Sequence, residues 1–294
     1  MTFSHHKGGT GKTTSCLNIA GFCALAGKRV LVVDCDPQAN ATAGLGFIPE
    51  NAGRNMYDVF MSSVKDFPET RISDIIKKTG AGIDLAPSHL DLVGVDPYLY
   101  QTGGRAGILK GALAGISSRY DYILVDTPPS LGQLVINGLV AADHIIVTLD
   151  SGSFALNGIS TLSTIFSDIK DDLGKEISPD LAIITRWGEG GVQDQKTVPE
   201  EKNDLISRIR DFFLKKPRPT GQEQKALEEQ NAEHERLLAM MTEVKRRFPA
   251  VYSVPYSPLV YEAQKRGLPI SHFAPESSAG VAYKTIADEV MRWN

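Results

Sequence analysis

Residues 7–14 read Lys-Gly-Gly-Thr-Gly-Lys-Thr-Thr, the most informative pattern in the chain. Its three glycines let backbone N–H groups approach a polyphosphate closely, while Lys12 can reach the phosphate oxygens and the Thr13 hydroxyl can hold Mg²⁺. The stretch is therefore interpreted as a phosphate-binding loop rather than as a glycine-rich turn without a ligand. We expect a nucleotide to contact Gly8, Gly9, Thr10, Gly11, Lys12, Thr13 and Thr14.

A helix is expected directly after the loop, from Gly11 to about Ala26. Its N-terminal end presents unpaired N–H groups and the positive end of the helix dipole to the same phosphates. The loop departs from the common pattern, because His6 stands where that pattern has its first glycine. Lys7 has no evident role within one subunit, since Lys12 already serves the phosphates. A solvated surface charge is the alternative interpretation of Lys7.

Composition describes an ordinary globular chain. The 294 residues are enough for one large α/β domain with its own core. The net charge of −4 gives no overall electrostatic case for nucleic-acid binding, which would need a local basic patch. Cys16, Cys23 and Cys35 lack metal-ligand spacing, and we expect reduced core cysteines. Reduced cysteines of this kind are typical of a cytoplasmic protein, which is the expected location. No apolar run approaches the ~18 residues of a membrane span and no signal peptide precedes the loop.

Apolar runs and helical patterns alternate along the chain, which is typical of an α/β fold with a mainly parallel sheet and helices on both faces. The expected strands are about Thr2–His6, Arg29–Asp34, Ile83–Ala86, Tyr122–Asp126, Ile145–Leu149 and Leu181–Thr185. The clearest other helices are Arg105–Ser117, Gly132–Ala142, Ala155–Lys170 and Ser277–Trp293. The first strand is short for a central strand, which leaves open whether residues precede Met1.

One stretch, residues 198–248, lacks strand signals and is rich in charge. Two helices are expected there, about Pro199–Leu214 and Gly221–Phe248, separated by Lys215-Lys216-Pro217-Arg218-Pro219. We interpret it as a helical insertion within a single domain that spans residues 1–294. The helices could lie on the sheet as a surface pair or form a dedicated contact surface.

Carboxylates follow two of the expected strands. Residues 34–38 read Asp-Cys-Asp-Pro-Gln, and Asp126 ends an apolar strand as in a Walker B motif. Ligands gather at the carboxyl ends of parallel strands, where the phosphate loop also lies. Such carboxylates can order Mg²⁺ and its waters or polarise an attacking water, although an Asp-Pro turn is the alternative at residues 34–38. The expected metal site consists of Thr13, Asp36 and Asp126.

Together these motifs resemble the deviant Walker A ATPases of the ParA/MinD/Soj family, in particular the ParA/Soj-type partition ATPases. The resemblance rests on the loop at 7–14, on residues 34–38 as switch I, and on Asp-Thr-Pro-Pro-Ser at 126–130 as switch II. It continues through residues 154–158 and covers nearly the whole chain except about Arg186 to Tyr252. It implies the P-loop NTPase fold.

The family resemblance also implies roles for particular residues. Lys7 would reach across an ATP-dependent sandwich dimer to the partner's nucleotide, Asp36 would orient the hydrolytic water, and Asp34 would support the site. Lys7, Lys12 and Asp36 are then the catalytic residues of an ATPase with slow intrinsic turnover, acting on ATP with Mg²⁺. By the same resemblance Pro255 and Ser257 border the adenine and Arg186 faces it from the other side, although residues 254–258 are, as plain sequence, only a proline-rich loop.

Two departures from the family concern DNA. Partition ATPases usually carry a basic residue after the proline at position 255, where this chain has Tyr256, and another near residues 188–191, which read Gly-Glu-Gly-Gly. Basic residues in the insertion can compensate and would give salt-sensitive DNA binding: Arg208, Arg210, Lys215, Lys216 and Arg218. A solvated helix face with balancing glutamates is the alternative.

The implied function is that of a ParA-like ATPase that binds DNA non-specifically as an ATP-bound homodimer. A ParB-like or cargo-adaptor protein would stimulate hydrolysis, so that DNA or a protein cargo is partitioned or positioned on the nucleoid. The alternative is an ATP-gated protein-interaction switch without DNA binding. A metabolic kinase or amidoligase is a third hypothesis, for which we find no second motif. Membrane anchoring is not expected, because the C-terminal segment carries little positive charge.

Overall fold

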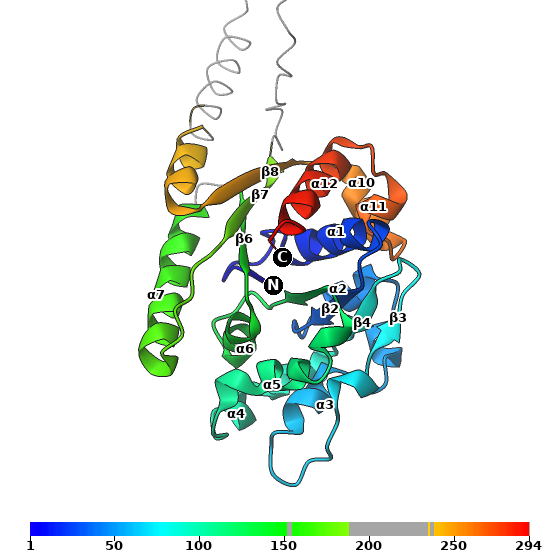
Figure 1. The fold of residues 1–294 in the computed structure, drawn as a ribbon, viewed down its shortest axis with the longest axis vertical. Coiled ribbons are helices and arrows are strands. Elements are labelled where there is room, and N and C mark those ends of the chain that lie inside the picture. Colours follow the sequence, from blue (N-terminus) through cyan, green and yellow to red (C-terminus); the bar gives the residue numbers. More distant parts are fainter. Residues whose placement is uncertain (152–154, 188–234, 236–237, 294) are drawn as a thin grey trace, which may run out of the picture.

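An eight-stranded sheet forms the centre of the molecule (Figure 1). The computed structural model describes residues 1–151, 155–187, 235 and 238–293. The strand order is β3-β4-β2-β5-β1-β6-β7-β8, and all neighbouring strands are parallel except β3 and β4. The strands are β1 (Thr2–Ser4), β2 (Val30–Asp34), β3 (Lys77–Lys78), β4 (Asp84–Ala86), β5 (Tyr122–Asp126), β6 (Ile145–Asp150), β7 (Leu181–Trp187) and β8 (Ala250–Pro255).

Helices cover both faces of this sheet (Figure 1). The α-helices are α1 (Lys12–Leu25), α2 (Asn40–Gly44), α3 (Met56–Met61), α4 (Asp96–Leu99), α5 (Ile108–Ala114), α6 (Gln133–Ala141), α7 (Ala155–Leu173), α10 (Pro258–Lys265), α11 (Ile270–Phe273) and α12 (Ser278–Val290). The 3₁₀ helices are η1 (Pro49–Asn51), η2 (Ile72–Asp74), η3 (Leu90–Gly94), η4 (Arg105–Gly107) and η5 (Ser117–Arg119). Core clusters place α1, α11 and α12 on one face and α3, α5, α6 and α7 on the other.

β2 shows why the central strands read as unbroken apolar runs. Val30 and Val32 belong to the core beneath α1, whereas Leu31 and Val33 belong to the core beneath α3 and α5. Successive side chains of a strand point to opposite faces, so a strand covered on both faces needs an apolar residue at every position. The prediction of a mainly parallel sheet with helices on both faces is confirmed.

The expected elements agree with the observed ones within a few residues, with two differences. The helix expected at Arg105–Ser117 is shorter, because η4 precedes it and Gly115 follows its last residue. The interpretation of residues 254–258 as only a proline-rich loop is wrong in part, since β8 runs to Pro255 and pairs with β7. β8 is the edge strand of the sheet, where a terminal proline costs no ladder hydrogen bond.

Most of the expected helical insertion lies outside the described residues. Its last part is described, and residues 238–247 form a helix. Met240, Val244 and Phe248 are buried in the same core cluster as Leu162 and Ile169 of α7. This part of the insertion therefore packs against α7. No helix of the described residues is both long enough and apolar enough to cross a membrane.

Candidate functional site

The phosphate loop connects the central strand β1 to α1. Gly9 and Gly11 have φ values of 77° and 83°, the left-handed region that glycine adopts without strain. A Cβ on Gly11 would also lie 2.7 Å from Cγ2 of Thr185, so two independent constraints require glycine there. A Cβ on Gly8 would meet only Pro129, at 4.0 Å. The protein itself therefore leaves room at Gly8, and contact of this backbone with a nucleotide stays a prediction.

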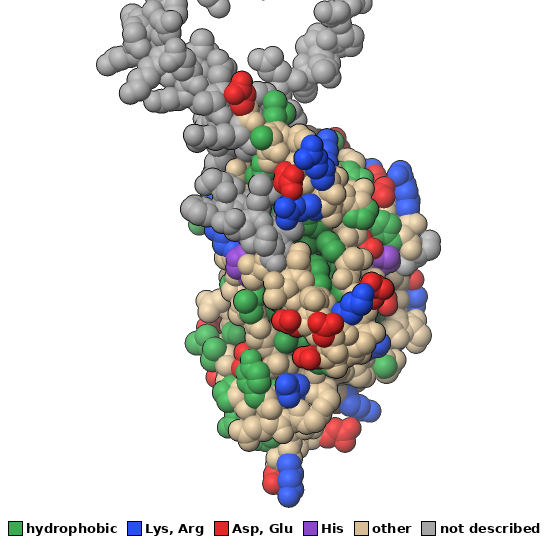
Figure 2. All heavy atoms as spheres, turned by 90° about the vertical axis from the view of Figure 1, so that its left-hand side faces the viewer, with side chains coloured by type: hydrophobic (Ala, Val, Ile, Leu, Met, Phe, Trp, Pro, Cys, Tyr) green, Lys and Arg blue, Asp and Glu red, His purple; other side chains and the backbone are tan. Residues whose placement is uncertain are grey.

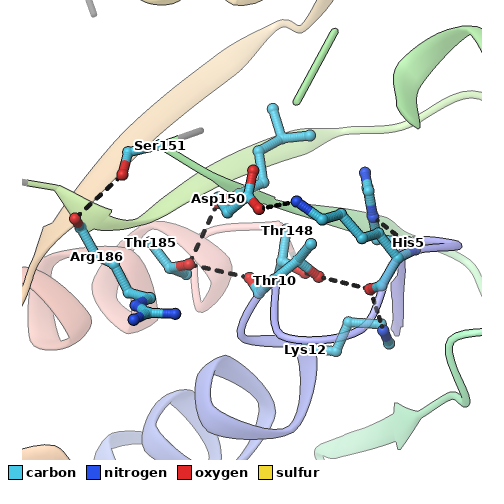
Figure 3. Close-up of polar contacts among 10 residues, drawn as sticks. His5, Thr10, Lys12, Thr148, Asp150, Ser151, Thr185 and Arg186 are labelled. Carbon is cyan, nitrogen blue, oxygen red and sulfur yellow. Dashed lines mark hydrogen bonds and ion pairs between the residues drawn. The ribbon is translucent and has the colours of Figure 1, made fainter. Parts of the chain in front are cut away.

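Threonine hydroxyls hold the loop against the ends of β6 and β7 (Figure 3). Oγ1 of Thr10 lies 3.0 Å from Oγ1 of Thr148, and Oγ1 of Thr185 donates to the carbonyl of Thr10 at 3.0 Å. Neither Thr148 nor Thr185 belongs to a motif recognised in the sequence. Both lie near the carboxyl ends of expected strands, which is the one signal that could have found them.

Lys12 and Thr13 lie at the start of α1, facing the carboxylates. Lys12 is 6% exposed, and its Nζ donates to the carbonyl of Lys7 at 3.2 Å across the loop (Figure 3). Burial lowers the pKa of Lys12, an effect that Asp126 and Asp36 oppose. Oγ1 of Thr13 donates to Oδ2 of Asp126 at 2.6 Å. The structure thus brings together two of the expected metal residues that are far apart in the sequence.

Asp34 and Asp126 are fully buried at the ends of the neighbouring strands β2 and β5. Burial raises the pKa of Asp34 to about 7, although hydrogen bonds from Thr42 N and Oγ1, at 2.8 and 2.7 Å, stabilise its charged form. Burial and the nearby Asp34 raise the pKa of Asp126 well above its usual value. Oδ1 of Asp126 is buried and has no hydrogen-bond partner. An oxygen of this kind beside the Thr13 hydroxyl fits a divalent cation.

Asp36 faces the same cavity as the phosphate loop. It is 5% exposed, its Oδ1 accepts a hydrogen bond from Gln38 N at 2.9 Å, and burial raises its pKa. The cavity has a volume of about 600 Å³ and is lined by Gly8, Gly9, Gly11, Lys12, Thr13, Thr14, Asp36, Gln38, Asn40, Ala43, Gly44, Pro129, Tyr261, Gln264 and Lys265. Among the described residues no group of three or more His, Cys, Asp or Glu side chains could hold a metal ion.

At the front of the loop, Lys7 forms an ion pair with Asp150 at the end of β6 (Figure 3). The Lys7 side chain is 42% exposed, and Oδ1 of Asp150 is buried without a hydrogen-bond partner. His5 is buried, and its Nδ1 accepts a hydrogen bond from Lys7 N at 3.0 Å. Burial lowers the pKa of His5 to about 4, so the ring is neutral at physiological pH. Neither His5 nor Asp150 was singled out by the sequence motifs.

Arg186, Pro255 and Ser257, expected beside a base, lie at the ends of β7 and β8. Arg186 has a φ of 57°, and its carbonyl accepts a hydrogen bond from Ser151 Oγ at 3.3 Å (Figure 3). None of the three residues lines the 600 Å³ cavity. Besides the phosphate loop and the Asp36 segment, that cavity is lined by residues of α10. There Gln264 donates a hydrogen bond from Nε2 to Thr14 Oγ1 at 3.2 Å. Contact of Arg186, Pro255 and Ser257 with adenine therefore stays a prediction.

Comparison with known proteins agrees with this geometry. Residues 1–179, more than half of the chain, match the AAA_31 family model, an AAA domain. The sporulation initiation inhibitor protein Soj of Bacillus subtilis is 36% identical over 186 residues, which cover 63% of this chain and 71% of Soj. The chain belongs to the ParA/MinD/Soj family of P-loop ATPases.

Two further similarities are informative. The chromosome partitioning protein ParA of Caulobacter vibrioides is 35% identical over 217 residues, covering 73% of this chain and 79% of that protein. A solved structure of cobyrinic acid a,c-diamide synthase from Mycobacterium smegmatis, with bound ATP analogue and magnesium, is 25% identical. It superimposes with a TM-score of 0.69 over 99% of this chain and 93% of that one.

The residues expected to contact DNA in this family member, Arg208, Arg210, Lys215, Lys216 and Arg218, lie outside the described residues. Of the nearby basic residues, Lys245, Arg246 and Arg247 are described, and all three are exposed. Two of them, Arg246 and Arg247, are paired with an acidic residue. They form ion pairs with Glu243 at 3.7 and 2.8 Å, respectively. Glu243 therefore offsets part of the positive charge at the end of this helix. Tyr256, at the usual basic position of the family, is 51% exposed.

Proposed function

We propose that this chain is a ParA-like ATPase that binds ATP and Mg²⁺, closes into a sandwich dimer and uses partner-stimulated hydrolysis to partition or position DNA or a protein cargo. The observation that carries the proposal is the meeting of three groups around one cavity. These groups are the phosphate loop with Lys12, the Thr13–Asp126 pair and the Asp36 carboxylate. The bound ATP analogue and magnesium in the Mycobacterium smegmatis structure support the choice of ligand.

Lys12 and the loop N–H groups would bind the β and γ phosphates. To do so Lys12 exchanges its hydrogen bond to the Lys7 carbonyl for phosphate oxygens, which better compensate a buried ammonium. Thr13, Asp126 and Asp36 would hold Mg²⁺, which when bound neutralises charge on the phosphate oxygens. The pKa of Asp126 is raised first by burial and then by the nearby Asp34, and a bound cation would offset both effects.

Asp36 would orient the attacking water. Its carboxylate faces the cavity beside the loop, and in the absence of ligand it is held by the Gln38 N–H. Water positioning by an acceptor is a recurring element of phosphoryl transfer, where catalysis rests on orientation and electrostatics. We infer slow intrinsic turnover, because a switch of this kind would use hydrolysis as a timer rather than for flux.

Lys7 would act in the dimer rather than within its own subunit. Its ammonium is directed to Asp150 at the rim of the site, while Lys12 occupies the interior of the loop. A half-exposed lysine can exchange one anionic partner for another at modest cost. In the proposed dimer Lys7 exchanges Asp150 for the phosphates of the partner's nucleotide.

Two alternatives differ in what the ATP state binds. An ATP-gated protein switch without DNA binding is favoured by the exposed Tyr256 and by the pairing of Arg246 and Arg247 with Glu243.

The other alternative, an amidoligase, is suggested by the Mycobacterium smegmatis relative. That activity needs a substrate pocket beside the phosphates, yet the two larger hollows of the described residues share no lining residue with the loop cavity.

DNA binding by the purified protein tests the proposal. It is measured with ADP, with ATP and with a slowly hydrolysed ATP analogue, each at low and at moderate salt. Binding only in the ATP states, with affinity falling steeply as salt rises, is the expected result. Absence of binding in every state, with dimerisation still dependent on ATP, would instead identify the protein-docking switch.

The triple variant Lys215→Ala, Lys216→Ala and Arg218→Ala is expected to lower DNA affinity about tenfold or more without changing the ATPase rate. Each lost cation removes phosphate contacts from both subunits and reduces the salt dependence of binding. Electrophoretic mobility shifts and phosphate release measure the two properties. An unchanged DNA affinity would contradict the role of the insertion in DNA binding, whatever the ATPase rate.

A further inference from the structure

A second hollow lies on the sheet face covered by α6 and α7, away from the phosphate loop. It has a volume of about 1230 Å³ and runs between α7 on one side and α6 with η4 on the other. Ile136, Val140, Ile165 and Ile169 give it an apolar floor. Two large apolar side chains that line it are solvent-exposed: Leu131 by 51% and Leu173 by 48%. We call this hollow the α6–α7 groove.

The length of the groove matches that of a short α-helix. α7 lines it with residues three and four positions apart, which form one face of a helix: Thr161, Thr164, Ile165, Asp168, Ile169 and Asp172. This face extends over about 16 Å at 1.5 Å per residue. Gln133, Ile136 and Val140 repeat with the same spacing on α6. A third helix of about three turns would fill the space between these two faces.

The two sides of the groove carry opposite charges. Asp168 and Asp172 lie on the α7 side, and Arg105 and Lys110 lie on the η4 and α5 side. Acidic side chains gather near the centre of the molecular face seen in Figure 2. In the part of the chain that the structure describes, none of these four residues takes part in an ion pair. The carboxylates of Asp168 and Asp172 can therefore pair with an occupant, while the Arg105 guanidinium lies over the Tyr100 ring, 5.8 Å from its centroid.

Hydrogen bonds between its own elements fix the walls of the groove. Asn137 of α6 donates a hydrogen bond to the Arg105 carbonyl at 2.7 Å and accepts one from Leu109 N at 3.1 Å. Lys175 donates to the carbonyls of Val140 and Ala142 at 2.7 and 2.8 Å, closing the C-terminal end of α6. A preformed site of this kind spares an occupant the cost of ordering it.

We propose that the α6–α7 groove binds an amphipathic helix of a partner protein, with basic residues facing Asp168 and Asp172 and acidic residues facing Arg105 and Lys110. An apolar stripe on the occupant would cover the floor, as in other helix-in-groove complexes. Charge complementarity favours this occupant over nucleic acid, which the acidic side of the groove would repel. The groove volume also exceeds the ~300–1,000 Å³ of small-molecule sites. The docking itself does not depend on the proposed ATPase activity.

The position of the groove relates it to the phosphate site. Leu131 and Gln133 border the groove and belong to the segment that leads from Asp126 into α6. Asp96 contacts this segment from outside, since its carboxylate accepts a hydrogen bond from the Gln133 backbone N–H. An occupant would thus touch the loop that follows the Asp126 carboxylate, which, if the proposed function holds, suits the partner that stimulates hydrolysis.

The test uses a phage-displayed library of 16-residue helix-forming peptides, selected on the full chain without nucleotide. Enrichment of peptides with apolar residues at i, i+3 or i+4, and i+7, flanked by basic residues on one side and acidic residues on the other, is the expected result. An enriched peptide is then synthesised, and its binding to purified protein variants is measured by fluorescence anisotropy.

Asp172→Lys and Asp171→Lys form a matched pair for this measurement. The two residues are adjacent and exposed on α7, but only Asp172 lines the groove. Asp172→Lys is expected to weaken peptide binding about fivefold to tenfold by placing like charges opposite each other, and Asp168→Lys to do the same, while Asp171→Lys stays within about twofold. Equal effects of Asp172→Lys and Asp171→Lys, or a selection without the flanking-charge pattern, would overturn the proposal. ATP affinity, measured separately, tests the proposed function and not the groove.

Discussion

Replacing Asp36 by alanine is expected to lower the ATPase rate about 100-fold or more, while ATP affinity falls less than about tenfold. The carboxylate lies 5% exposed at the cavity of the phosphate loop, where it can orient a water. Loss of a positioned acceptor affects the transition state more than ground-state binding, because orientation supplies much of the catalysis of phosphoryl transfer. Phosphate release and isothermal titration with ATP and Mg²⁺ measure the two effects.

A matched control for this variant is Asp171→Ala, which removes an exposed carboxylate from α7, away from the loop cavity. Its turnover is expected to equal that of the wild type. If Asp36→Ala kept its rate within about threefold of the wild type, the water-positioning role would be wrong. A loss of ATP binding as large as the loss of rate would instead assign Asp36 to metal or phosphate binding alone.

Replacing Lys12 by alanine is expected to weaken ATP binding about 100-fold. Lys12 is the buried cation of the loop, 6% exposed, and a charge-assisted hydrogen bond to phosphate in such a site contributes about 1.5–3 kcal/mol. Its removal also leaves Asp36 and Asp126 without their nearby positive charge. Isothermal titration with ATP in the presence of Mg²⁺ measures the change.

Lys28→Ala is the control for the Lys12 variant, because Lys28 is an exposed lysine just beyond the end of α1. It is expected to bind ATP like the wild type. Far-UV circular dichroism confirms that both variants are folded before they are compared. Retention of wild-type ATP affinity by Lys12→Ala would contradict the interpretation of residues 7–14 as the nucleotide site.

The sequence predicts those parts of the site whose residues lie close together in the chain, in a recognisable pattern. Glycines and a lysine within eight residues define the loop, and an unbroken apolar run that ends in aspartate locates Asp34 and Asp126. The pairing of Thr13 with Asp126 followed from a general rule, since the carboxyl ends of parallel strands meet at one edge.

The contacts that the sequence did not predict depend on the order of the strands. Asp150 reaches Lys7 only because β6 is the direct neighbour of β1, although the two are distant in the chain. The order of strands follows from crossover connections and helix packing, which leave no local sequence signal. Thr148 and Thr185 were missed for the same reason.

β8 was missed for a different reason. Pro255 at its end and the charged stretch before it concealed a short edge strand, which tolerates proline where a central strand does not. The α6–α7 groove, in turn, depends on the distance between two helices on the sheet. That distance is a property of tertiary packing, and the periodic apolar positions of α6 and α7 alone do not encode it.

In the proposed dimer, Lys7 of one subunit contacts the nucleotide of the other. This contact is tested most directly by measuring mass in solution, by light scattering on a sizing column, in the Asp36→Ala background that retains ATP. With ATP and Mg²⁺ we predict a dimer of twice the 31.9 kDa chain mass, and with ADP a monomer. Adding Lys7→Ala is predicted to leave a monomer that still binds ATP. A dimer that forms with ATP equally well without Lys7 would show that Lys7 does not act on the partner's nucleotide.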